Sequence, residues 1–131
     1  LAISVDSPFS YLHSLLSKRS EGGLGNLDYP LISDLNKSIT NKYKLLTNDG
    51  FSFPGLFIID KEGIIQYYTV NNLLCGRSIN ELLRMLKSIQ YIKENPGQAC
   101  PVDWKYGDKI LYSHPLKSKI YFKTLYSHKK N

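Results

Sequence analysis

The 131-residue sequence contains few cysteines and no closely spaced cysteine pair. Its two cysteines, Cys75 and Cys100, are too few for the disulfide framework of a small secreted domain. The three histidines, His13, His114 and His128, are scattered without the spacing of metal ligands, so we expect no zinc site. A thiol in an accessible segment can still exchange with other thiols, and redox chemistry therefore remains open.

Long hydrophobic runs are also missing. The apolar run "GLFIID" is far too short to span a bilayer, and we expect no membrane partner. The opening "LAISVDSPF" has no basic region before its apolar residues, so it is interpreted as a strand and not as a secretory signal. The chain opens inside an apolar run without an initiator Met, and we therefore expect a fragment of a longer protein.

Acidic residues are outnumbered, with 11 Asp and Glu against 17 Lys and Arg, a net charge of +6 and a pI near 9.3. Much of the excess lies between Lys105 and Lys130. Basic and aromatic residues do not alternate there as in nucleic-acid-binding segments, so we expect a solvated basic surface and no nucleic-acid partner. Residues Gly22 to Gly25 do not open a helix after a strand, which excludes a phosphate-binding loop of the usual spacing.

The predicted elements follow the order β-α-β-α-β-β-α, which is typical of an α/β fold with a mixed central sheet flanked by helices. Ser7 and Pro8 begin a helix, Asp34 is expected to cap another over "DLNKSITNKYKLL", and Ser78 with Glu81 forms a capping box before a third. The remaining predicted elements are strands at "LAISVD", "LIS", "GLFIID", expected to be buried on both faces, and "GIIQYYTV", and a terminal helix at "LKSKIYFKTLYS".

The hairpin followed by a packing helix matches the second half of a thioredoxin-like fold. The first half is not in these residues, so the opening strand would find its sheet neighbours before Leu1. We expect a core over residues 1–94 and a C-terminal arm with a terminal helix over residues 95–131.

The segment "GQACPVDWKYGD" places Cys100 directly before a proline, in a polar stretch beyond the last strongly periodic helix. A buried structural cysteine would lie in an apolar run, so this context indicates an arm, with Trp104 as its anchor in a hydrophobic groove. Cys75 is expected to be a packed, unreactive thiol, with a redox pairing to Cys100 as the alternative.

Four segments in register resemble the typical 2-Cys peroxiredoxins: "ISVDS", "GGLGNLDYPLISDLNKSITNKYKLL", "GLFIIDKEGIIQYYTVNNLLCGRSINELLRMLKSIQY" and "GQACPVDWKYGD". The resemblance runs from residue 1 to about residue 125 and corresponds to the C-terminal two thirds of a family member. It implies a thioredoxin-like peroxiredoxin fold.

The resemblance also implies a function. In the family, a peroxidatic cysteine attacks hydrogen peroxide or an alkyl hydroperoxide and becomes a sulfenic acid, and a resolving cysteine from the partner subunit's arm condenses with it. Thioredoxin or a similar dithiol reduces the resulting disulfide, and no metal or organic cofactor is involved. Cys100 matches the resolving cysteine, and Arg77 matches an arginine near the site.

Further residues match other family features. Gly22, Gly23, Leu24 and Gly25, together with Tyr121 and Phe122, match two segments of members that excess peroxide inactivates easily. The family forms homodimers through the strand matched by "GIIQYYTV", and these often assemble into decamers. The low cysteine count fits a reducing compartment, either the cytoplasm or an organelle.

Two departures keep other interpretations open. The peroxidatic cysteine is not among these residues, and Pro54 stands where the family has an active-site arginine that lowers the thiolate pKa. A catalytically degenerate subunit that binds partners or acts as a chaperone is therefore an alternative, as is a thioredoxin-fold protein-binding module. Cys100 as an inert surface thiol, Arg77 as a salt-bridging residue, residues 22–25 as an ordinary loop, and Tyr121 and Phe122 as packing residues also stay open.

Overall fold

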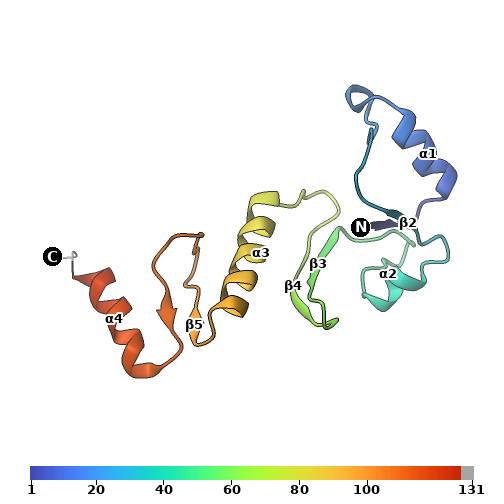
Figure 1. Cartoon of the computed structure of the whole chain (residues 1–131). Helices are drawn as coiled ribbons and strands as arrows, with labels where there is room; N and C mark the ends of the chain where they lie inside the picture. Colours follow the sequence, from blue (N-terminus) through green and yellow to red (C-terminus); the bar gives the residue numbers. More distant parts are fainter. Residues whose placement is uncertain (128–131) are drawn as a thin grey trace. The chain divides into compact units, whose positions relative to one another are not determined.

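The computed structural model describes residues 1–127, so His128 lies outside the described residues. The elements in chain order are β1 (Ala2–Ser4), α1 (Pro8–Leu16), the short 3-10 turn η1 (Arg19–Glu21), β2 (Leu31–Ser33), α2 (Ser38–Lys42), β3 (Gly55–Ile59), β4 (Ile65–Val70), α3 (Ile79–Glu94), β5 (Gln98–Ala99), β6 (Leu111–Tyr112) and α4 (Pro115–Tyr126) (Figure 1). This order confirms the predicted elements and adds the β5–β6 pair.

The chain divides into two compact units. The first, which we call the amino unit, comprises Leu1–Leu56 and Tyr68–Gly76, and the second, the carboxyl unit, comprises Phe57–Tyr67 and Arg77–Asn131.

In the amino unit, helix α1 connects two parallel strands. Strands β1 and β2 pair in register from Ala2 opposite Leu31 to Ser4 opposite Ser33. The helix begins as predicted, because the Ser7 hydroxyl accepts a hydrogen bond from the amide of Ser10 and Pro8 occupies the first turn. The Tyr11 hydroxyl donates to the carbonyl of Ile32 at 2.9 Å, which ties the helix to β2.

Helix α2 is shorter than predicted. It begins at Ser38 and not directly after Asp34, because Lys37 adopts a left-handed conformation with φ 62°. Asp34 still caps the helix: its carboxylate accepts hydrogen bonds from the amides of Ile39 at 3.0 Å and Thr40 at 2.7 Å. The prediction of the cap is confirmed, while the predicted helix start was wrong because the side chain reaches across an intervening turn.

Strands β3 and β4 form the predicted hairpin. The Asp60 carboxylate accepts hydrogen bonds from the amides of Glu62 and Ile64, and Gly63 takes the positive φ of 83° that closes the turn. The prediction that the β3 segment is buried on both faces was wrong, since its residues are half-buried and Ile59 is exposed. Within the described residues β3 has one paired strand, β4, and its faces are only partly covered.

The carboxyl unit is built on α3. This helix begins at the predicted cap, where the Ser78 hydroxyl accepts from the amide of Glu81 at 3.2 Å, and it ends at Asn95 before Gly97, which has φ 83°. Beyond it, β5 and β6 pair antiparallel, with Gln98 opposite Tyr112. The long loop between these two short strands carries the cysteine and the tryptophan of the arm.

Across residues 1–127 the strands pair as β1 with β2, β3 with β4 and β5 with β6. The parallel β1–β2 pair and the antiparallel β5–β6 pair give both strand orientations. None of the helices in this part of the chain is long and apolar enough to cross a membrane.

Candidate functional site

Cys100 directly follows strand β5 in the carboxyl unit. It is half-buried, and its sulfur lies 3.9 Å from the carbonyl oxygen of Ser88 on α3. The pairing of Ala99 with Leu111 fixes the backbone immediately before it. The thiol is therefore packed against its own helix by non-covalent contacts.

This packing affects the acidity of the thiol. Burial raises the pKa of Cys100, while the contact with Ser88 and the positive charge of Arg84 lower it, and the pKa remains above its ordinary value. Because a thiolate is the nucleophile and the thiol is not, Cys100 is poorly reactive in this packed position.

Trp104 confirms the prediction of an arm anchor. It is only 2% exposed, and its ring centroid lies 4.9 Å from that of Tyr91 on α3 and 6.3 Å from that of Tyr106. The indole Nε1 donates to the carbonyl of Asp108 at 3.1 Å, so the polar edge of the buried ring is satisfied. The anchor lies four residues after Cys100 and thereby holds the segment that carries the thiol.

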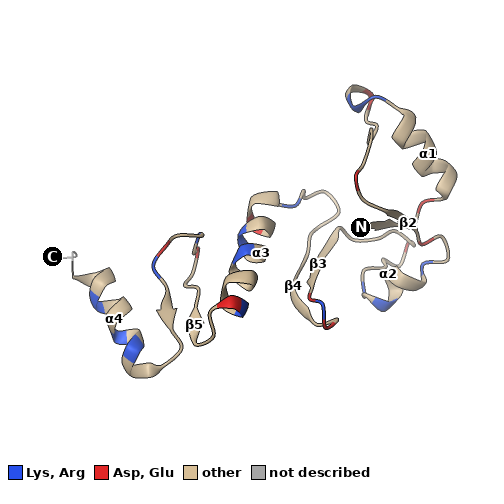
Figure 2. Ribbon diagram, in the orientation of Figure 1, with Lys and Arg blue, Asp and Glu red and all other residues tan. Residues whose placement is uncertain are grey.

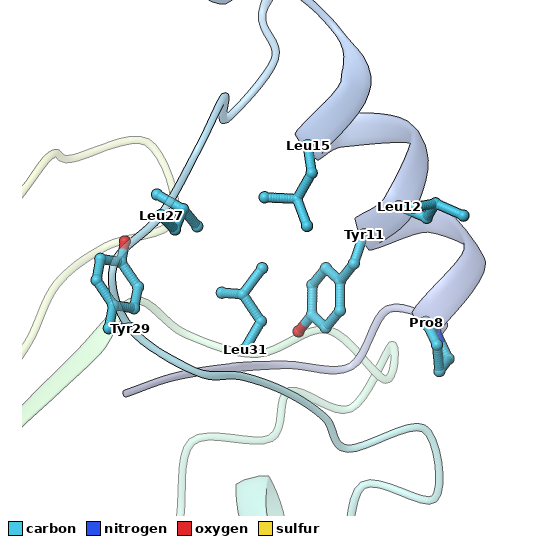
Figure 3. Close-up of a pocket in the computed structure, with 7 residues that line it drawn as sticks. All are labelled: Pro8, Tyr11, Leu12, Leu15, Leu27, Tyr29 and Leu31. Carbon is cyan, nitrogen blue, oxygen red and sulfur yellow. The ribbon is translucent and has the colours of Figure 1, made fainter.

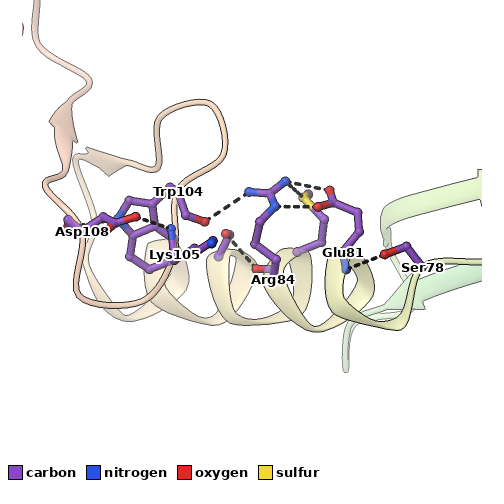
Figure 4. Close-up of polar contacts among 8 residues, drawn as sticks. Ser78, Glu81, Arg84, Trp104, Lys105 and Asp108 are labelled. Atoms are coloured by element: carbon purple, nitrogen blue, oxygen red, sulfur yellow. Dashed lines mark hydrogen bonds and ion pairs between the residues drawn. The ribbon is translucent and has the colours of Figure 1, made fainter.

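Arg84 is a residue of this site that the sequence analysis missed. Its Nε and Nη2 atoms donate to the two carboxylate oxygens of Glu81 at 2.7 and 2.8 Å, and its Nη1 donates to the backbone carbonyl of Trp104 at 3.3 Å (Figure 4). The hydrogen-bonded Glu81 raises the pKa of the Arg84 guanidinium, which stays charged. The three-residue spacing of Glu81 and Arg84 on a helix signals the ion pair, but no sequence signal identifies Trp104 as a partner.

The same helix contributes a buried serine. The Ser88 hydroxyl donates to the carbonyl of Arg84 at 2.9 Å, while the carbonyl of Ser88 faces the sulfur of Cys100. The loop after Trp104 is closed by the amide of Lys105, which donates to the carboxylate of Asp108 at 2.8 Å (Figure 4). Helix α3 thus contacts the Cys100 thiol through Ser88 and the Trp104 carbonyl through Arg84.

The structure does not bring Arg77 and Cys100 together. Arg77 is exposed and immediately precedes the Ser78 cap at the start of α3. Ser88, which contacts Cys100, lies nine residues beyond the first helical residue, Ile79, or about 14 Å along the axis at the usual helical rise. Arg77 and Cys100 therefore lie beside different parts of this helix.

Cys75 and Pro54 both lie in the amino unit. The prediction that Cys75 is packed was wrong, because it is an exposed free thiol in a turn in which its amide donates to the carbonyl of Asn72. Pro54 precedes β3, and its carbonyl accepts from the amide of Asn71 at 3.0 Å. A proline side chain offers neither a charge nor a donor, so this position cannot act as the arginine of the family does.

The segment Gly22, Gly23, Leu24 and Gly25 folds back on the end of α1. The amide of Leu24 donates to the carbonyl of Ser14 at 2.7 Å, and a Cβ at Gly23 would lie only 2.1 Å from the carbonyl oxygen of Ser17. Glycine is therefore required at this close approach.

Tyr121 and Phe122 lie on α4 in the carboxyl unit. Their ring centroids are 5.6 Å apart in an edge-to-face arrangement, and the Phe122 side chain is exposed. Lys117, Lys119 and Lys123 make this helix basic along its length (Figure 2). The glycine segment belongs to the amino unit and this aromatic pair to the carboxyl unit.

A shallow apolar hollow lies beside α1 in the amino unit. Leu15 of the helix points towards Leu27 and Leu31 of the following segment, while Leu12 lies at the outer rim (Figure 3). The Tyr11 hydroxyl at its edge is already bonded to the backbone. The hollow therefore offers apolar contact but no reactive group.

No cluster of three or more possible metal ligands occurs within residues 1–127.

Comparison with known proteins identifies the family. The profile of the AhpC/TSA family matches residues 1–68. A Trieres chinensis protein named as a peroxiredoxin, ycf42, is 73% identical over 131 residues, which is all of this chain and 64% of that protein. The chloroplastic 2-cysteine peroxiredoxin of Chattonella marina var. antiqua is 54% identical over 125 residues, or 95% of this chain and 64% of that protein. The chain thus spans just under two thirds of the length of these relatives.

Solved structures agree with the sequence relatives. The reduced 2-Cys peroxiredoxin of Plasmodium vivax superposes with a TM-score of 0.88 at 35% identity, covering 92% of this chain and 62% of that one. The mitochondrial 2-Cys peroxiredoxin of Plasmodium falciparum has a TM-score of 0.71 at 42% identity, covering 76% of this chain and 58% of that one. The chain therefore belongs to the AhpC/TSA family and has the thioredoxin-like fold of a 2-Cys peroxiredoxin over the C-terminal part that it spans.

Proposed function

We propose that this chain is the part of a peroxide-reducing 2-Cys peroxiredoxin that supplies the resolving cysteine, Cys100. The observation that carries the proposal is the setting of this thiol. It lies after a two-residue strand, in a loop fastened to α3 by one indole and one guanidinium. Such contacts can break and re-form without unfolding the helix, which a thiol that crosses to a partner subunit requires.

The proposed peroxide reduction needs one further thiol, the peroxidatic thiol of the partner subunit. A peroxidatic thiolate of the partner subunit attacks the hydroperoxide, the O–O bond breaks, an alcohol or water leaves, and a sulfenic acid forms. The Cys100 thiolate then attacks that sulfur, an S–S bond forms, and hydroxide leaves and takes up a proton. A dithiol such as thioredoxin supplies two electrons to restore both thiols.

The raised pKa of Cys100 supports a thiol that is unreactive while the loop is packed on α3 and becomes reactive when the loop leaves it. Burial raises the pKa, so the packed thiol stays protonated at neutral pH. Release into water removes that effect and returns the pKa towards its ordinary value, near 8.5. Exposure of the arm and activation of the thiol would therefore occur in one step.

The other site assignments belong to the same proposal. Arg77, at the start of α3, would support the peroxidatic site, and the residues 22–25 segment with Tyr121 and Phe122 would make the enzyme sensitive to overoxidation. Residues 95–131 would act as the arm, and β4 would pair two subunits into a homodimer that can assemble further. The chloroplastic names of several relatives favour an organelle over the cytoplasm.

Pro54 favours a second candidate function. If the family arginine before β3 is needed for peroxide activation, its replacement leaves a subunit that binds partners or acts as a chaperone without catalysis. The fold and the arm would be the same in both cases. Only a measurement on the peroxide reaction separates them.

The test is peroxide-dependent cross-linking of the intact protein. After addition of hydrogen peroxide, a non-reducing gel is expected to show a dimer band that disappears with dithiothreitol and is absent from Cys100→Ser. Cys75→Ser is the matched control and should keep the band, because its thiol lies in a turn of the other unit. Absence of the band from the unaltered protein would favour the non-catalytic function, and its persistence in Cys100→Ser would exclude Cys100 as the resolving thiol.

A further inference from the structure

Arg84 joins the arm to the helix beneath it. Its guanidinium carries donors on three nitrogens, and two of these grip the Glu81 carboxylate while the third reaches the Trp104 carbonyl (Figure 4). The side chain is 21% exposed, so these bonds are mostly shielded from water. Hydrogen bonds from a charged donor are stronger than those between neutral groups. The bond from Arg84 therefore ties the Trp104 backbone to α3 by a charged contact.

We infer that Arg84 is a positioning residue that holds the Cys100 loop closed on α3 through the Trp104 carbonyl, with Glu81 fixing the orientation of the guanidinium. This inference rests on the proposed role of Cys100 as the resolving thiol. Breaking one bond, from Arg84 to Trp104, would then be a required part of releasing the thiol.

The positions of Arg84, Ser88 and the Trp104 carbonyl explain how the Arg84 side chain can hold the Cys100 loop. Ser88 lies one helical turn after Arg84 and touches the sulfur of Cys100, so the thiol and the Trp104 carbonyl lie against the same part of α3. The Trp104 amide donates to the carbonyl of Pro101 at 3.2 Å, which closes a tight turn between the thiol and the anchor. For Cys100 to leave the helix while Trp104 stays bound, this tight turn would have to open.

Charged and titratable neighbours of Arg84 could also affect its bond to the Trp104 carbonyl. Glu81, Asp103 and Tyr67 are the groups whose charge acts on Arg84, and Arg84 acts on the Cys100 thiol. A purely structural alternative is that Arg84 only pairs with Glu81 to stabilise α3. A purely electrostatic alternative is that Arg84 acts on Cys100 through charge alone, without holding the loop.

The pH profile of Cys100 alkylation separates these three possibilities. The intact, reduced protein is treated with iodoacetamide across neutral to alkaline pH without peroxide, and the Cys100 peptide is quantified by mass spectrometry. Arg84→Gln should label about tenfold faster at neutral pH, which corresponds to about 1.4 kcal/mol and lies just below the range of a hydrogen bond to a charged group, about 1.5–3 kcal/mol. Arg84→Lys, which keeps the charge and loses the fork, should give a smaller increase, and Glu81→Gln a similar one.

The direction of the midpoint shift adds a second readout. Release of the loop removes the burial that raises the pKa, so the midpoint should fall in Arg84→Gln. Loss of charge from a loop that stays closed would raise the midpoint. Lys87→Gln is the matched control, because it removes one positive charge from an exposed position of the same helix, and it should label as the unaltered protein does.

An Arg84→Gln protein that labels at the rate and midpoint of Lys87→Gln would overturn the inference, as would a raised midpoint without faster labelling. If circular dichroism shows that Arg84→Gln does not fold, Arg84→Lys and Glu81→Gln decide by the same criteria. The labelling needs no peroxide and no partner thiol. Its outcome is therefore independent of the cross-linking test of the proposed function.

Discussion

Each unit holds one loop in place with a fully buried side chain, and the two side chains are of opposite chemical character. In the amino unit Asp34, 2% exposed, fastens the turn before α2 with hydrogen bonds to residues no more than six positions away. In the carboxyl unit Trp104, also 2% exposed, fastens the arm by packing on Tyr91, thirteen positions earlier in the chain.

The two sets of contacts differ in how easily they could break and re-form. Burial raises the pKa of the Asp34 carboxyl, but hydrogen bonds from Thr40, Ile39 and Ser38 outweigh this effect and the pKa lies below its ordinary value. That carboxylate stays charged and bonded at any pH near neutrality. The Trp104 anchor depends on apolar packing and one guanidinium bond to a separate element, and breaking these contacts would leave the hydrogen bonds within α3 intact.

The largest effect is expected for Trp104→Ala. Removing a buried indole typically costs about 3–5 kcal/mol in the free energy of unfolding, and here the loss falls on the arm. Hydrogen exchange of residues 97–112 should accelerate strongly, while exchange in β1 and α1 should not change. Trp104→Phe keeps a ring at this position and should give a smaller acceleration, and equal protection of the arm in Trp104→Ala would contradict the anchor.

An intermediate effect is expected for Thr40→Val in the amino unit. The variant keeps the shape of the side chain but removes the hydroxyl that donates to the Asp34 carboxylate at 2.7 Å. The amide of Thr40 still donates to the same oxygen, so the expected loss is about 1 kcal/mol in a denaturant titration. Ser38→Ala is the control, since its hydroxyl contact is longer, at 3.4 Å, and should contribute less.

The smallest effect is expected for Lys93→Gln. Lys93 on α3 pairs with Glu62 of the hairpin turn at 3.1 Å, and both side chains are about 60% exposed. An exposed pair of this kind contributes less than about 0.5 kcal/mol, so the thermal unfolding midpoint should hardly move. A loss of stability as large as that of Thr40→Val would show that this exposed ion pair contributes as much as the buried hydrogen bond to Asp34. It would contradict the view that burial decides how strongly each contact stabilises its unit.

The local features of the fold were predictable from the sequence. The caps at Ser7, Asp34 and Ser78 were correct because each side chain bonds to amides a few residues away. The hairpin turn at Asp60–Gly63 followed from the same kind of local signal. The start of α2 was wrong because residues 35–37 form a turn that Asp34 spans, and periodicity alone could not reveal it.

The candidate site was only partly predictable. Cys100 and its anchor Trp104 could be identified from their unusual context, and the burial of Trp104 is confirmed. The β5–β6 pair escaped because two-residue strands have no measurable alternation. Arg84 escaped because its partner lies twenty positions further along the chain. The exposure of Cys75 escaped because free cysteines are most often buried, and nothing in the sequence marks this one as an exception.

By itself, the sequence determined which side chains cap the helices and where the hairpin turns, because these depend on side chains that bond to their own neighbourhood. Only the tertiary structure decided what holds the segment around Cys100 on α3: the packing of Trp104 on Tyr91, the bond from Arg84 to the Trp104 carbonyl and the bond from the Tyr91 hydroxyl to Gln98. These contacts join positions far apart in the chain, and their strength comes from exclusion of water, which exists only once the loop has closed on the helix.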